Sequence, residues 1–164
     1  MSEAGLPRIR PGTDADGAAC ARLIEAVFAE YPGCLFIAAE FPELAGLASH
    51  FADRGGRLWV AEDGGAIVGC VGVDTAPLTD GMEVHKLYVA RAARGRGLAS
   101  ALYALAEAFA RDRGAGFIEL WSDTRFLDAH RFYERHGFTR LPGRRALDDA
   151  SRSYEFHYRK RLKG

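Results

Sequence analysis

The stretch from residue 82 to residue 114 constrains the fold of this chain most strongly. It begins with an apolar-alternating run that predicts a strand, and it continues through the glycine-rich sequence Arg94-Gly95-Arg96-Gly97. A run with apolar residues at helical spacing follows, formed by Leu98, Leu102, Leu105 and Phe109. The first turn of a helix carries N–H groups without intrahelical partners and a partial positive charge. Because glycines let a phosphate approach the backbone, the unit predicts a site for a phosphate-bearing ligand near residue 97.

The glycines alone leave other interpretations open. A G-x-G turn is more often a plain tight turn, and an RGRG string also occurs in flexible RNA-binding tails. The strand and helix on either side argue against a tail. Two common phosphate motifs are absent, since no G-x-x-x-x-G-K-[ST] occurs and the third glycine of G-x-G-x-x-G is replaced by Ser100.

What the segment matches is the pattern [Q/R]-x-x-G-x-[G/A], with Arg94, Gly97 and Ala99 at its fixed positions. It follows a strand that ends in Leu87-Tyr88-Val89. On these residues the chain resembles the GCN5-related N-acetyltransferase (GNAT) family. A second segment, DAHRFYERHGF at residues 128–138, resembles the family's A-x-x-x-Y-x-x-x-G-F pattern. In this order and spacing the two motifs are more specific than either alone.

The remaining patterns predict one α/β domain over residues 1–164. Helices are expected at residues 13–30, 42–54, 98–113 and 126–136. Strands are expected at residues 8–10, 58–62, 66–73, 82–89, 117–122, from 138 onward, and at 153–161. The order β-α-α-β-β-β-α-β-α-β-β is that of the family. The resemblance therefore implies a GNAT-like fold, a mixed and mostly antiparallel sheet of about six or seven strands with about four helices.

Charge and cysteine content limit the class of protein. The 22 basic residues equal the 22 acidic ones, so no overall field favours nucleic acid or a membrane surface, and neither partner is expected. Cys20, Cys34 and Cys70 are odd in number and widely spaced, which argues against a disulfide framework or a zinc site, and no metal is expected. The N-terminus lacks the apolar core of a signal peptide, and no run is long enough to span a membrane. A cytoplasmic location is expected.

The resemblance implies acetyl-CoA as co-substrate and assigns its contacts by position. The pantetheine arm would enter between the strands at 82–89 and 117–122, and its amides would add to the edge of the earlier strand at Leu87, Tyr88 and Val89. Ordinary core positions are the alternative for this strand, and both readings hold together because the contacts use main chain. The pyrophosphate would be held by backbone amides, with arginine side chains adding charge, over Arg94, Gly95, Arg96, Gly97, Leu98, Ala99 and Ser100.

Transfer to an amine requires a neutral amine, a polarised thioester carbonyl and a proton for the departing thiolate. No covalent enzyme intermediate is required. The resemblance assigns the proton donor to Tyr133, at the tyrosine position of the second motif. The alternative is an aromatic side chain that only packs under the sheet.

Glu83 and His85 are the candidate bases, because they lie two apart on one strand and therefore on one face. The alternative is a surface carboxylate with a structural histidine. Asp74, at the end of the preceding strand, is a weaker candidate. If Glu83 and His85 face the cleft, alternation places Lys86 and Tyr88 on the opposite face.

The chain departs from the family at Phe126, where many members carry an asparagine, and this weakens any polar contact to the cofactor there. Arg131 either reaches the 3′-phosphate of CoA or pairs with Asp128 or Glu134. The acceptor site is expected from residues 30–43 and 142–158, where carboxylates and aromatics suit a cationic amine but also suit a solvated loop. The sequence does not choose among a small polyamine-like amine, an aminoglycoside-like drug, an amino acid and a peptide amine.

Three functions follow in order of support. The first is an acetyl-CoA-dependent N-acetyltransferase acting on a primary amine of a small molecule or peptide. The second is a catalytically inactive acyl-CoA-binding regulatory module. The third, a nucleic-acid-binding protein using Arg94, Arg96 and the basic C-terminus, is opposed by the zero net charge. The apolar last strands either pair across a homodimer or close the sheet of one chain.

Overall fold

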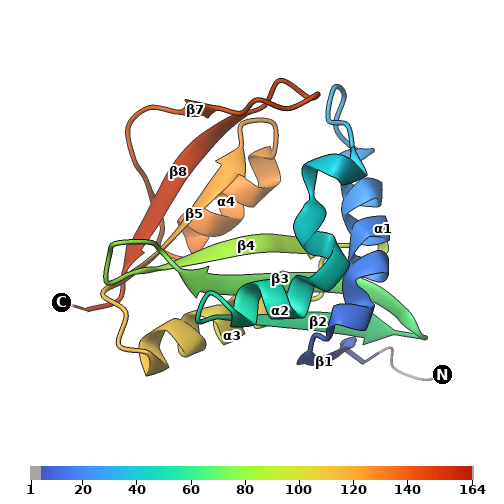
Figure 1. Ribbon diagram of the computed structural model, residues 1–164, viewed down its shortest axis with the longest axis horizontal. Coiled ribbons are helices and arrows are strands. Elements are labelled where there is room, and N and C mark those ends of the chain that lie inside the picture. Colours follow the sequence, from blue (N-terminus) through green and yellow to red (C-terminus); the bar gives the residue numbers. More distant parts are fainter. Residues whose placement is uncertain (1–4, 164) are drawn as a thin grey trace.

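The computed structural model describes residues 5–163 as one mixed β-sheet with helices on both of its faces (Figure 1). The strands are β1 (Arg8–Pro11), β2 (Arg57–Asp63), β3 (Ala66–Thr75), β4 (Met82–Val89), β5 (Phe117–Asp123), β6 (Thr139–Arg140), β7 (Arg145–Ala146) and β8 (Tyr154–Arg161). The α-helices are α1 (Gly17–Phe28), α2 (Leu47–Ala52), α3 (Leu98–Asp112) and α4 (Leu127–Arg135). Short 3-10 turns precede α1 and α2, at Asp14–Asp16 (η1) and Pro42–Gly46 (η3).

The sheet has the order β1-β2-β3-β4-β5-β8-β6, and β7 pairs with β8. Every neighbouring pair is antiparallel except β4 with β5. The expected fold and element order are confirmed. The eight strands exceed the expected number because the segment after α4 contributes the two-residue strands β6 and β7 as well as β8.

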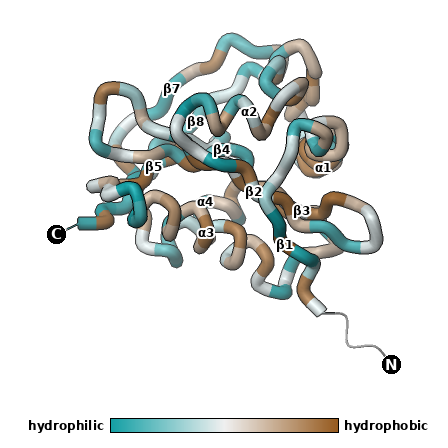
Figure 2. Tube along the Cα trace, turned by 60° about the horizontal axis from the view of Figure 1, so that its bottom comes forward, coloured by the Kyte–Doolittle hydropathy of each residue, from teal (hydrophilic) through white to brown (hydrophobic). Residues whose placement is uncertain are grey.

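Alternation along the strands divides the core between the two faces. In β2, Leu58 and Val60 pack with α1 and α2, whereas Trp59 and Ala61 pack with α3. Figure 2 shows hydrophobic stretches along the central strand β3, which is covered on both faces. Helices thus pack against both faces of the sheet, and this packing holds the strands that carry the loops in place.

The two N-terminal helices begin later than the sequence predicts. Asp16 receives both Arg10 guanidinium nitrogens at 2.8 Å and the Thr13 backbone N–H at 2.8 Å, so the first turn is a 3-10 turn anchored to β1. Gly46 interrupts the expected second helix with φ −151° and ψ 61°, and the α-helical part begins at Leu47. Local hydrogen bonds and one glycine therefore shorten both helices.

A bulge in β4 corrects the expected alternation. The pairs Cys70–Tyr88 and Gly72–His85 enclose one residue in β3 but two in β4. Lys86 accommodates the extra residue with a left-handed φ of 54°. Lys86 and Tyr88 consequently lie on the same face as His85, and the expectation that they face the opposite side is wrong.

Contacts on that face confirm the effect of the bulge. The rings of His85 and Tyr88 pack at 5.9 Å from Phe51 and 6.0 Å from Phe28, respectively. Lys86 Nζ lies 2.7 Å from Glu43, in the 3-10 turn before α2. The extra residue thus gathers consecutive polar side chains of β4 on one face.

Strands β4 and β5 separate soon after they meet. Their parallel pairing includes only Met82–Ile118 and Glu83–Glu119. Beyond this point β5 continues to pair with β8 as far as Asp123–Glu155, while the edge of β4 that faced β5 has no strand beside it. The separation opens the sheet along β4 beyond Glu83, and Figure 1 shows β4 and β5 diverging.

Candidate functional site

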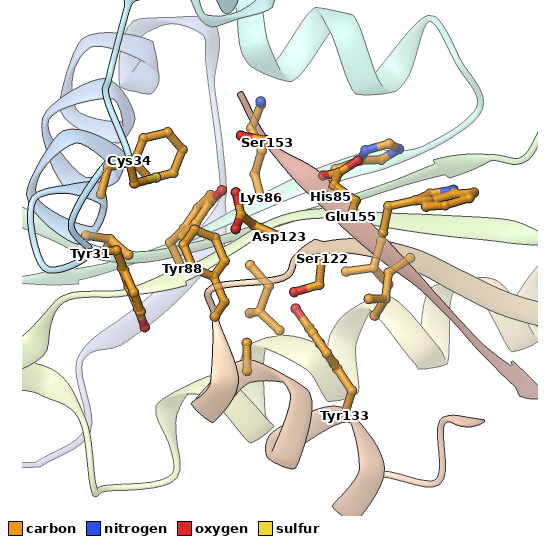
Figure 3. A pocket seen from close by; sticks show the side chains of 18 of the residues that line it. Tyr31, Cys34, His85, Lys86, Tyr88, Ser122, Asp123, Tyr133, Ser153 and Glu155 are labelled. Carbon is orange, nitrogen blue, oxygen red and sulfur yellow. The ribbon is translucent and has the colours of Figure 1, made fainter. Parts of the chain in front are cut away.

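A cavity of about 500 Å³ lies where β4 and β5 separate. Its walls come from both strands, the end of α1, the first turn of α3, the length of α4, and the loops before β8 (Figure 3). These elements are far apart in the sequence, and the separated strands bring them together. Within residues 5–163, no helix is long and apolar enough to cross a bilayer, and no three side chains form a metal-binding group.

The glycine-rich turn presents open backbone at one end of this cavity. Gly95 and Gly97 have φ values of 82° and 79°, and a Cβ on either would meet no atom within 4 Å. In the described part of the chain, no backbone N–H from Gly95 to Ser100 donates to a backbone acceptor, and the first such bond runs from Ala101 to Gly97 at 3.0 Å. Free N–H groups at the start of a 15-residue helix form an anion-binding geometry.

The residues of this turn differ in what their side chains do. Leu98 is buried in the core, whereas Ala99 lines the cavity. The Arg94 guanidinium donates to Glu30 at 2.6 and 2.7 Å and to the Val89 carbonyl at 3.1 Å. Arg94 therefore joins the turn to α1 and β4, and its charge is already paired.

Two other side chains, one before α3 and one in its first turn, belong to this region. Arg96 makes no ion pair with any residue from 5 to 163, so it is the cation of the turn left for a ligand. Ser100 Oγ lies 3.0 Å from His136 Nε2, at the end of α4. No local pattern predicts this hydrogen bond, because it joins residues that are 36 positions apart.

The C-terminal end of β4 and the residue before α4 line the middle of the cavity. Leu87 and Val89 pack toward α3, whereas Tyr88 packs against α1, and all three residues line the cavity. Phe126, in place of the expected asparagine, packs its ring 4.7 Å from Tyr31. Its position gives the cavity an apolar wall rather than a polar contact.

Tyr133 reaches the cavity from α4. Its ring is 8% exposed and packs 5.8 Å from both Phe138 and Tyr158. Its hydroxyl points into the cavity toward Ser122 and has no hydrogen-bond partner among residues 5–163 (Figure 3). Burial raises the pKa of Tyr133, with a smaller effect from Tyr158, so the phenol holds its proton firmly. The side chain thus both packs under the sheet and offers a proton donor.

Glu83, His85 and Asp74 form a cluster on the face opposite Tyr133. His85 Nε2 lies 3.0 Å from Asp74 Oδ1 and 3.0 Å from Glu83 Oε2. Burial alone lowers the pKa of His85, but the hydrogen bond to Asp74 and the charge of Glu83 outweigh it and raise that pKa. Burial raises the pKa of Glu83, and the nearby His85 opposes that shift. Both groups are therefore shifted toward the range in which a base works at neutral pH.

Two loops that are distant in the sequence meet where both line the cavity. The Leu35 N–H donates to Ser151 Oγ at 2.8 Å, and this hydroxyl donates to the Leu35 carbonyl at 3.2 Å. The Ala150 N–H donates to Glu40 Oε2 at 2.8 Å. The segments at residues 30–43 and 142–158, predicted to build the acceptor site, are thus brought together.

Aromatic and charged groups line this end. The Trp121 ring stacks on His157 at 4.2 Å, and the Arg145 guanidinium lies 3.9 Å from its centroid. Asp123 accepts from Arg125 at 2.7 Å, and the same guanidinium reaches Ser153 at 2.9 Å. Sequence reasoning missed Trp121, Asp123 and Arg125, because they belong to no motif and lie outside the two predicted segments. They meet residues of the predicted segment 142–158 only through pairing of β5, β7 and β8.

Arg131, the other candidate for a cofactor phosphate, lies on the outer side of α4. Its Nη1 is 2.7 Å from Asp128 Oδ1, and its side chain is 65% exposed. The pairing with Asp128 is the second of the two expectations for this residue.

Comparisons with known proteins show what the chain is similar to. Residues 20–138 match the family model described as "Acetyltransferase (GNAT) family". The chain is 34% identical over 142 residues to the Escherichia coli protein named "Uncharacterized N-acetyltransferase YjgM", a match that covers 82% of this chain and 83% of that protein. It is also similar to the Salmonella typhimurium acetyltransferase yncA, whose structure contains acetyl-CoA, with a TM-score of 0.73 at 18% identity over 97% of this chain and 95% of that one.

Mammalian relatives match over a shorter part. The mouse protein named "Probable N-acetyltransferase family 8 member 5" is 35% identical over 102 residues, which are 60% of this chain. The matched part covers 45% of that protein, so the chain spans less than half the length of this relative.

Proposed function

The chain belongs to the GNAT family of N-acetyltransferases, and from that premise we propose that it moves the acetyl group of acetyl-CoA to a primary amine by direct attack. No covalent enzyme intermediate forms. The observation that carries the proposal is a single cavity with unpaired backbone N–H groups at one end, Tyr133 at its middle and the Glu83–His85 pair opposite. Each of these groups answers one requirement of the reaction.

The donor fits the main chain of this cavity. The unpaired edge of β4 offers the backbone of Leu87 and Val89 to the pantetheine amides, as an added strand would use it. The N–H groups from Gly95 to Ser100 suit the pyrophosphate, and Arg96 adds a positive charge. When bound, acetyl-CoA supplies the thioester, and these residues orient it along the opening between β4 and β5.

The amine must lose a proton before it attacks. Glu83 and His85 line the cavity and share a contact of 3.0 Å, so they act together as the base. Two carboxylates near the mouth, Glu40 and Asp149, make no ion pair within the described residues and favour entry of a cationic amine. The proposed acceptor is therefore an ammonium ion in solution that becomes neutral inside the cavity.

The thiolate of CoA leaves as the new N–C bond forms and the C–S bond breaks. Tyr133 gives it a proton, because its hydroxyl points into the cavity and a phenol is protonated at neutral pH. Its proton is replaced by one that the attacking nitrogen loses. The net products are an amide, free CoA and one released proton.

A coupled binding and turnover experiment tests the proposal. Acetyl-CoA raises the melting temperature, since a ligand that binds only the folded chain stabilises it. Thiol release and mass-spectrometric detection of an acetylated product are then followed across a panel of primary amines. Stabilisation without transfer to any amine would favour the regulatory acyl-CoA-binding module instead. No stabilisation at millimolar acetyl-CoA would sink both functions.

A further inference from the structure

Asp74 is a buried carboxylate that the proposed reaction leaves without a role. It is 5% exposed, at the end of β3, and lies directly across from Glu83 in the sheet register. No Arg or Lys within residues 5–163 pairs with it, and its ionic contact is His85. A buried charge needs a partner, so Asp74 and His85 depend on each other.

The imidazole of His85 is held from several sides. The Phe51 ring of α2 packs 5.9 Å from it, and a Cβ on Gly72, its partner in β3, would come within 2.1 Å of that same phenyl ring. The charged groups that act on it are Asp74 on β3 and Glu83 and Lys86 on β4.

Groups on neighbouring elements are farther away or already paired. Lys86 forms an ion pair with Glu43 of η3. The charge of Asp74 also acts on His50 of α2, where it favours a higher pKa of that imidazole. From β5, Glu119 acts on Glu83 and is itself bound to Arg159 at 2.8 Å. The contacts of His85 Nε2 with the Asp74 and Glu83 carboxylates therefore set the orientation of the ring.

We propose that Asp74 is a positioning residue that binds His85 through Nε2, so that the neutral imidazole keeps its proton there and Nδ1 accepts the proton of the amine. The inference rests on the proposed function. Within the proposed base, it assigns proton acceptance to His85 and the positioning of that imidazole to Asp74. The ammonium N–H bond breaks, its proton forms a new bond to Nδ1, and the electron pair stays on the amine nitrogen. Within residues 5–163, Nδ1 has no hydrogen-bond partner. Asp74 and Glu83 stabilise the imidazolium, which later releases its proton to solvent.

A spectroscopic experiment tests the assignment without any substrate. Nitrogen NMR of the imidazole side chains reports the tautomer and titration of His85. The expected neutral form carries its proton on Nε2, and Asp74→Asn lowers the pKa of His85 because it removes the carboxylate that favours the cation. Asp63→Asn is the matched control, since Asp63 is exposed at the end of β2 and makes no ion pair in the described chain. A neutral form protonated on Nδ1 overturns the proposal, as does an unchanged titration in Asp74→Asn.

Kinetics separates positioning from a merely structural role. Asp74→Asn lowers kcat by about tenfold or more, part of the roughly 10²–10⁴ that a general base contributes. The acid limb of its pH profile moves to lower pH, while KM for acetyl-CoA stays unchanged. Asp74→Glu, which restores the carboxylate, returns part of the rate. A loss of rate with the wild-type pH profile in Asp74→Asn would contradict the proposal.

The two proposals can fail separately. If no amine is acetylated by the unmodified protein, the proposed function fails, and the His85 tautomer still decides the role of Asp74. If Asp74→Asn does not fold, the tautomer of the unmodified protein decides alone.

Discussion

The two halves of the cavity are built from different parts of the polypeptide. The donor half, the backbone of residues 87–89 with the turn at 95–100, lies within one strand–turn–helix unit. The acceptor half, formed by residues 31–41, 121–125 and 145–155, combines side chains from three distant segments. In the proposed function, the donor half binds through main chain held by regular structure, whereas the acceptor half depends on side chains and loop contacts. This difference predicts separable effects of mutation.

Tyr133 lies between the halves and gives the largest expected effect. Tyr133→Phe keeps the ring in its packing against Phe138 and Tyr158 but removes the proton donor. We expect kcat to fall by about 100-fold, within the range for a general acid, with KM for acetyl-CoA nearly unchanged. Steady-state thiol release measures both constants.

Tyr154→Phe is the matched control for that substitution. Tyr154 is 41% exposed and lies under the Arg144 guanidinium, outside the cavity. It should keep the wild-type rate. An unchanged kcat in Tyr133→Phe would show that Tyr133 is not the proton donor. No residue would then link the donor half to the acceptor half in the mechanism.

A substitution at Gly97 is the most direct way to weaken ligand binding in the donor half. Gly97→Ala places a Cβ on the open side of the turn and forces a left-handed φ that costs about 1–2 kcal/mol. We expect affinity for acetyl-CoA to fall by about tenfold, measured by calorimetry, because the phosphates lose close approach to the N–H groups. Affinity for the amine at saturating acetyl-CoA should change little.

Gly64→Ala separates strain from ligand contact. Gly64 has φ 57°, and its Cβ would also meet no atom within 4 Å, but it lies in the turn between β2 and β3. It should lose similar stability without losing acetyl-CoA affinity. Equal losses of affinity in both variants would mean that the turn acts only through folding.

The same difference explains what the sequence could predict. The fold and the glycine turn follow from local patterns, in which glycines, a strand and a helix adjoin within 33 residues at 82–114. The bulge at Lys86 does not, because it depends on how β4 registers with β3. One extra residue reversed the expected faces of Lys86 and Tyr88. Local chemistry is readable from sequence, whereas register is a property of the assembled sheet.

The acceptor half was predictable only as two segments. Their composition indicated carboxylates and aromatics, but the Leu35–Ser151 contact joins residues 116 positions apart. Trp121 and His157 stack only because β5 and β8 pair at that register. No sequence spacing predicts such contacts, because they form only when distant strands and loops meet in the folded chain.

The loop contact at Ser151 gives a smaller effect on the acceptor half. Ser151→Ala removes both hydrogen bonds to Leu35, each of which contributes about 0.5–1.5 kcal/mol. We expect KM for the amine to rise by about three- to tenfold, with acetyl-CoA affinity unchanged. Initial rates at varied amine and saturating acetyl-CoA measure it.

Ser49→Ala is its control, because it removes the hydrogen bond that the Ser49 hydroxyl donates to Asp14, outside the cavity, and keeps the one that the Ser49 backbone N–H donates. It should leave both constants at their wild-type values. If Ser151→Ala instead weakened acetyl-CoA, the halves would be coupled and the proposed division would be wrong.

Arg96 gives the smallest expected effect, and it tests whether the donor half binds by main chain. Its guanidinium has no ionic partner in residues 5–163, so in Arg96→Ala acetyl-CoA loses one charge contact while every backbone N–H remains. We expect affinity to fall by only about two- to fivefold, and the difference to shrink at high salt because exposed charges are screened. Arg131→Ala, which removes a surface pair with Asp128, is the control and should leave affinity unchanged. A loss larger than that in Gly97→Ala would show that the arginine, rather than the row of N–H groups, holds the phosphates.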